Sequence, residues 1–178
     1  MRVRRADKEV PELAAVLDVL ARGEVARIAM VTEDGPYVVP VSYAVLPAGD
    51  GEPLRIVVHG AREGRKVEAL RRDPRVCVEV TVDVATVQAV RACDVTVRFR
   101  SVIAFGRAVF LEEPAARARA LAAIVDRYAP LPRIRSGGQA GTLPIDEAKA
   151  RKIAILEIRL DSATCKVSPP PRATGKGA

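Results

Sequence analysis

Apolar residues at helical spacing predict three helices along the chain. These helices cover residues 9–22, 64–72 and 114–128. Gly23 follows the first helix at the position of a stop signal, and Pro114 suits the first turn of the third.

Apolar residues in alternation predict six strands around these helices. The strands cover residues 25–32, 37–44, 54–59, 75–82, 96–111 and 152–160. The turn Glu33-Asp34-Gly35 joins the first two strands into a hairpin. Proline cannot donate a hydrogen bond to a neighbouring strand, so Pro40 predicts an edge, a bulge or an unpaired stretch in the second strand.

The long strand 96–111 has no plainly aqueous face. One face carries Val97, Phe99, Ser101, Ile103, Phe105 and Val109. The other carries Arg98, Arg100, Val102, Ala104 and Ala108. We expect this second face to meet another subunit or a ligand.

Short strand connections and the number of strands predict a mainly β fold with flanking helices. The sheet is expected to be antiparallel, with six strands closed into a barrel. Residues 84–95 show no period and are predicted as a loop. A single domain is expected over residues 1–162, with a Pro- and Gly-rich excursion at 129–151, and residues 163–178 are expected to be a flexible tail.

The composition indicates an aliphatic core and a reducing compartment. The 178 residues include three Tyr, three Phe and no Trp, and no apolar run approaches the ~20 residues of a membrane span. The charged N-terminal segment does not resemble a signal peptide. Three widely spaced cysteines argue against a disulfide framework, so a cytoplasmic location is expected and no membrane partner.

The formal charge of +7 favours anionic partners, although several of the cations lie near the chain ends. One histidine and three scattered cysteines leave no credible zinc site, so no metal is expected. The sequence also contains no phosphate-binding loop of the Walker kind, no Gly-x-Gly-x-x-Gly after a strand and no Gly-x-Ser-x-Gly elbow.

The segment His59-Gly60-Ala61-Arg62-Glu63-Gly64-Arg65-Lys66 is the most informative part of the chain. It joins a predicted strand to a predicted helix. Its glycines let backbone N–H groups approach an anion, and the helix start adds unpaired donors. Arg65 and Lys66 supply the charge that a phosphate monoester needs. An ordinary basic surface turn is the alternative.

Two further side chains each have two possible roles. His59 is either a structural histidine at a strand end or a hydrogen-bond donor to a ligand beside the phosphate. Arg100 lies among apolar neighbours; it is either a cation at a subunit rim or a cation that stabilises an anionic reduced flavin.

Several segments in order resemble the FMN-binding split-barrel superfamily of pyridoxamine 5'-phosphate oxidases, and most of all its 5-nitroimidazole-resistance branch. The matching segments are Arg27-Ile28-Ala29-Met30, Gly35 to Val41, His59 to Lys66, Leu70 to Cys77, Cys93, and Phe99 to Ala108. They extend over roughly residues 3–128. The resemblance implies a split β-barrel.

The resemblance also implies a homodimer with FMN at the interface, acting on a small-molecule substrate. Val39, Pro40, Val41 and Ser42 would border the flavin ring. The ribityl phosphate would be held by His59, Gly60, Ala61, Gly64, Arg65 and Lys66. Arg100 and Ser101 would come near the ring from the other subunit. Members of the resistance type reduce a nitro group through the flavin, with no catalytic side chain implied here. Gly60 departs from the hydroxyl residue of many relatives.

Two other functions compete with a flavin-dependent reductase. A non-catalytic flavin or haem binder could use the same barrel, with His59 as the only imidazole for the iron. A nucleic-acid-binding barrel is disfavoured because few aromatics are present for base stacking.

Overall fold

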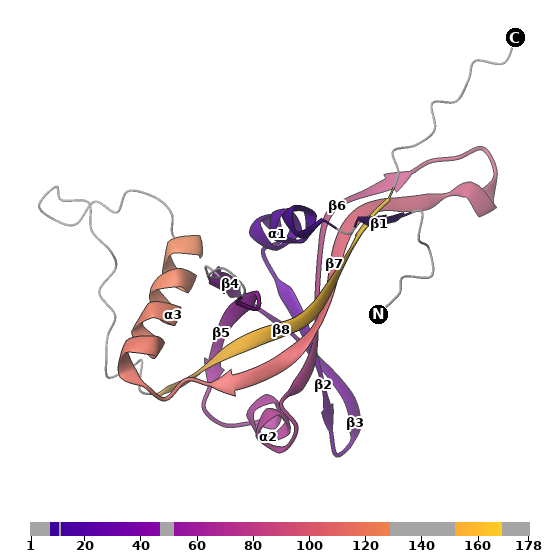
Figure 1. The fold of residues 1–178 in the computed structure, drawn as a ribbon. Helices are drawn as coiled ribbons and strands as arrows, with labels where there is room; N and C mark the ends of the chain where they lie inside the picture. Colours follow the sequence, from indigo (N-terminus) through magenta and orange to yellow (C-terminus); the bar gives the residue numbers. More distant parts are fainter. Residues whose placement is uncertain (1–7, 11, 47–51, 129–151, 169–178) are drawn as a thin grey trace, which may run out of the picture.

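The protein is an antiparallel sheet with helices packed around it (Figure 1). The computed structural model describes residues 8–10, 12–46, 52–128 and 152–168. The strands in this part of the chain are β1 (Glu9–Val10), β2 (Ala26–Thr32), β3 (Gly35–Val41), β4 (Tyr43–Leu46), β5 (Arg55–Ala61), β6 (Arg75–Val87), β7 (Thr96–Phe110) and β8 (Ile153–Val167). The helices are α1 (Leu13–Arg22), α2 (Arg65–Arg72) and α3 (Pro114–Tyr128), with a short 3₁₀ turn at Ala92–Asp94. No helix among the described residues has both the length and the apolarity to cross a membrane.

The strand order gives the predicted split barrel. The order is β3-β2-β6-β7-β8-β5-β4, and β1 pairs with β8. β3 and β4 lie at the two ends of this order, yet only Ser42 separates them in the chain. The sheet therefore curls so that its ends approach at Ser42, and no β3–β4 pairing closes it within the described residues. Pro40 lies on an end strand, which confirms the expected edge position.

The aliphatic core fills the inside of the curled sheet. Val76, Val78 and Val80 alternate inward along β6 as the pattern predicted, and α1 adds Val19 and Leu20. A second cluster lies under α3 and consists of Ala44, Val57, Ala120, Ile124 and Ile155. β5 and β8 are covered on both faces, and their sequences therefore contain continuous apolar runs.

Two predicted boundaries at the N-terminal end change. α1 begins at Leu13 rather than residue 9, because Glu9 and Val10 pair with Lys166 and Cys165 of β8. The strand predicted over 37–44 is two strands, since Ser42 lies where the chain passes from one end of the sheet order to the other.

The later strands are longer than the sequence pattern predicts. β6 continues to Val87 and, with β7, forms a hairpin that extends away from the barrel, so part of the predicted loop at 84–95 is strand (Figure 1). β8 continues to Val167, so the predicted tail begins inside a strand. Asp161, Ser162 and Thr164 interrupt the apolar pattern, and β7 stabilises the extension by pairing with it beyond a bulge. The expected excursion at 129–151 lies outside the described residues.

The face of β7 that was expected to meet another subunit or a ligand is covered by the protein's own core. Val102, Ala104 and Ala108 are buried in the core of their own chain, so the prediction that they meet another subunit or a ligand is wrong. The curl of the sheet covers that face. The opposite face leaves Phe105 and Val109 each 37% exposed.

Candidate functional site

The ends of β3 and β5 meet beside the start of α2. Tyr43 is the register partner of Val58, so the same register continued by one residue places Ser42 next to His59. Val39, Pro40 and Val41 precede Ser42 on β3. The predicted ring-bordering residues and the predicted phosphate segment therefore adjoin one another. We call the group formed by residues 39–42, 59–61 and 64–66 the cradle.

Gly64 sets the direction in which α2 begins. Its φ of +105° lies in the region that favours glycine, and a side chain there would strain the backbone. Its carbonyl oxygen accepts the N–H groups of Val67 and Glu68 at 2.9 and 3.1 Å. No side chain caps this end of the helix, so the first N–H groups remain available to an anion.

Lys66 is the cation of the cradle. Its ammonium group lies over the backbone of Gly60, where a Cβ at position 60 would come 2.5 Å from Nζ. The side chain is half-buried, and burial lowers the pKa of Lys66. No ion pair joins Lys66 to a carboxylate of the described residues. A partly desolvated ammonium without a counter-charge favours the binding of an anion.

His59 lies at the rim of the cradle, exposed to solvent on one side. Desolvation by the neighbouring protein atoms, and then the charge of Lys66, lower the pKa of His59 below its usual 6.5. The imidazole is therefore neutral at pH 7 and can accept or donate a hydrogen bond.

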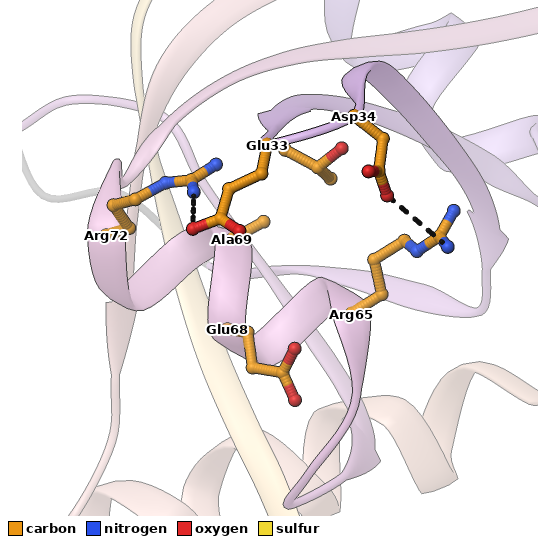
Figure 2. Close-up of a pocket in the computed structure, with 7 residues that line it drawn as sticks. Glu33, Asp34, Arg65, Glu68, Ala69 and Arg72 are labelled. Atoms are coloured by element: carbon orange, nitrogen blue, oxygen red, sulfur yellow. Dashed lines mark ion pairs between the residues drawn. The ribbon is translucent and has the colours of Figure 1, made fainter.

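Arg65 points away from Gly60, toward the β2–β3 turn. Its guanidinium lies 3.6 Å from Asp34 Oδ2 and 5.3 Å from the centre of the Tyr37 ring. Arg72 pairs with Glu33 at 2.7 Å on the same side, and a cavity of about 430 Å³ separates the turn from α2 (Figure 2). The sequence does not indicate these ion pairs, although Glu33 and Asp34 both lie in the predicted turn.

Arg100 and Ser101 lie far from the cradle within one chain. Arg100 pairs in register with Val167 of β8, whereas His59 pairs with Ile155 of the same strand. Twelve residues of strand correspond to roughly 40 Å. Arg100 faces α1, where one of its terminal nitrogens lies 2.8 Å from Asp18 Oδ2. Ser101, the next residue in the strand, points to the opposite face. The structure thus brings together the backbone of ten of the twelve predicted site residues, with the side chain of Arg65 turned toward Asp34.

No metal site emerges from the described residues, which contain no cluster of three or more His, Cys, Asp or Glu side chains that could hold an ion. The cysteines in this part of the chain are all free: Cys93 is exposed and Cys165 is buried.

Comparison with known proteins gives the family. The model of the pyridoxamine 5'-phosphate oxidase family matches residues 12–167, which include every element from α1 to β8. The chain belongs to this family. Within the family, this chain has a glycine at residue 60 and a β6–β7 hairpin that extends beyond the barrel. A comparison with curated proteins found no match.

Solved structures share the fold at low sequence identity. A candidate 5-nitroimidazole antibiotic resistance protein from Bacteroides thetaiotaomicron is 19% identical, with a TM-score of 0.71 over 89% of this chain and 86% of its own. The flavocytochrome Anf3 from Azotobacter vinelandii is 24% identical, with a TM-score of 0.76 over 96% and 73%. An FAD and heme binding protein from Mycobacterium smegmatis is 22% identical, with a TM-score of 0.72 over 92% and 74%.

Proposed function

We propose that the cradle binds a flavin by its phosphate and that the flavin is FMN. The observation that carries this proposal is the half-buried ammonium of Lys66, which lies over bare backbone with no carboxylate partner among the described residues. A phosphate at Gly60 and Gly64 would neutralise it and accept the free N–H groups at the start of α2. Family membership and the flavin named in two of the structural neighbours support the same ligand class.

The other cradle residues have distinct tasks in this proposal. His59, neutral at pH 7, donates a hydrogen bond to the phosphate without adding charge. The backbone of Val39, Pro40, Val41 and Ser42 borders the ring and keeps water from one side of it. Arg65 contacts the phosphate once its ion pair with Asp34 has broken. That ion pair is exposed and its atoms are 3.6 Å apart, so it contributes little stability and Arg65 can exchange Asp34 for the phosphate.

We further propose that the protein is an oxidoreductase acting on a small aromatic substrate of the nitro type. FMN, when bound, supplies the electron transfer, and the side chains of this chain bind, orient and exclude water. The likeness to the resistance protein supports this substrate class.

A homodimer would complete the site. The outward face of β7 exposes Val97, Phe105 and Val109, and Ser101 lies on the same face. A second copy seated on this face would bury the exposed apolar side chains and bring Ser101 to the partner's flavin. Light scattering of the purified protein tests this: a monomer at all concentrations would remove the dimer and the role of Ser101 with it.

The phosphate assignment is tested by titrating the protein with FMN and following flavin fluorescence. Lys66→Met should weaken binding at least tenfold, because a charge-assisted hydrogen bond contributes roughly 1.5–3 kcal/mol. Arg119→Met removes an exposed cation from α3 and serves as the matched control, with unchanged affinity expected. Equal affinities for all three proteins would refute the cradle as the phosphate site.

Haem is a second candidate ligand, because two structural neighbours are named as flavocytochrome and as heme binding. His59 is the only imidazole of the chain, and its lowered pKa leaves it neutral and able to ligate iron. A haem titration tests this candidate: a Soret shift that is lost in His59→Ala would support it, and an identical spectrum in the variant would dismiss it.

A further inference from the structure

A second pocket lies at the other end of the molecule, where the β6–β7 hairpin leaves the barrel. Its volume is about 440 Å³, within the range of small-molecule sites. The residues that matter for its chemistry are Asp83, Val84, Arg98, Phe99, Arg100 and Val167. None of them belongs to the cradle, and the register partners of the two places on β8 lie twelve residues apart, a strand length of roughly 40 Å.

The backbone beside this pocket is irregular. The pairing of β6 with β7 shifts register between Val82 and Ala85. Asp83 lies in this bulge with a φ of 57°, the only non-glycine residue of the described chain with a positive φ. Bulges and strained residues of this kind concentrate near functional sites, where they redirect side chains.

Not every hydrogen-bond donor of the Arg100 guanidinium has a partner among the described residues. One terminal nitrogen lies 2.8 Å from Asp18, while Nε is buried and has no partner among the described residues. Arg98 lies two residues away on the same face of β7, and no ion pair to it is found in this part of the chain. Both guanidinium groups line one pocket, and the exposed Arg98 has donors available to a ligand.

The carboxylates beside these two arginines are shared with a third arginine, Arg22. Arg22 donates to both oxygens of Asp83, which lowers the pKa of Asp83, and it also lies 3.5 Å from Asp18. Among the described residues, Arg22, Arg98 and Arg100 gather beside the two carboxylates of Asp18 and Asp83. Val84, which is 66% exposed, and Val167 supply apolar wall beside the charge.

We propose that this pocket binds a small carboxylate with a flat apolar body, held at its charged end by Arg98 and Arg100. The carboxylate takes the unused guanidinium donors, and the apolar body covers Val84 and Val167. In this proposal Arg100 binds the carboxylate on the face of β7 where its side chain lies within its own chain. This role replaces the stabilisation of reduced flavin that the sequence suggested for Arg100. Within one chain this pocket shares no residue with the cradle.

Calorimetric titration of the full-length protein with benzoate tests the proposal, with benzamide as an uncharged ligand of the same shape. Benzoate should bind at least tenfold more tightly than benzamide. Arg98→Ala should weaken benzoate about tenfold, and Arg98→Lys should recover part of the loss. Arg98 is exposed and makes no ion pair in the described chain, so this variant should fold normally. Arg107→Ala, which removes an exposed cation of β7 outside the pocket, is the matched control.

Three results would overturn the proposal: equal binding of benzoate and benzamide, no effect of Arg98→Ala, or an equal effect of Arg107→Ala. A repeat of the titration in excess FMN separates this pocket from the cradle. Unchanged benzoate affinity supports a separate site, whether or not FMN itself binds. Competition between FMN and benzoate would assign the pocket to the flavin and contradict the proposal.

Discussion

The ammonium group of Lys66 occupies the space that a side chain at Gly60 would fill, with Nζ 2.5 Å from the position of a Cβ. Gly60→Ala should therefore displace the ammonium and weaken FMN about tenfold. Lys66 is a flexible side chain and Gly60 has no positive φ, so the free energy of unfolding should change by less than about 1 kcal/mol. FMN titration and urea unfolding of the same variant measure both quantities. Full FMN affinity in Gly60→Ala would show that this space is not needed.

Gly106→Ala should behave in the opposite way. A Cβ at Gly106 would overlap the carbonyl oxygen of Arg159, which belongs to the backbone of β8 and cannot rotate away. We expect a loss of roughly 1–3 kcal/mol or more in the free energy of unfolding, measured in urea beside Gly60→Ala. The prediction fails if the two alanine variants are equally stable.

Tyr43 ties β4 to the end of α1. Its buried hydroxyl donates to the carbonyl oxygen of Leu20 at 2.6 Å, and burial is the main reason that the pKa of Tyr43 rises to about 12. Arg127 also donates to that oxygen at 2.8 Å, so Tyr43→Phe leaves it with a partner. The expected loss is about 1 kcal/mol in urea unfolding. Tyr37→Phe, which keeps the ring under Arg65, should lose less; an equal loss would contradict this role.

The single histidine allows its titration to be followed by one NMR signal. The pKa of His59 should lie below 6.5 in the folded protein, because desolvation and then Lys66 disfavour the cation. Lys66→Met should raise it part of the way back, since desolvation remains. The unfolded chain binds more protons in the window between the folded pKa and 6.5, so folding stability from this group rises with pH across that window and is lowest below it. A folded pKa at or above 6.5 would refute both causes.

The sequence predicts those parts of the fold that depend on local pattern. The alternation of Val76, Val78 and Val80 placed the start and the inward face of β6 correctly, and the proline at 114 placed the start of α3. The end of β8 could not be predicted, because the mostly polar residues 161–164 become strand only by pairing with β7. Long-range pairing of this kind leaves no local signal.

The cradle was predictable because its glycines and cations lie in one short segment. The direction of Arg65 was not, since its partner Asp34 comes from a turn whose distance from α2 depends on the folded sheet. The same holds for Arg100: its strand was predicted, but the bulge at Asp83 and the contact with Asp18 arise from separate elements.

Flavin binding by the cradle is tested by an absorption spectrum of the purified protein, followed by release of the ligand and determination of its mass. We expect a yellow protein that holds FMN in an amount equal to that of the chain. A colourless protein that also fails to take up added FMN would contradict flavin binding, and would leave a split barrel whose cradle serves another ligand.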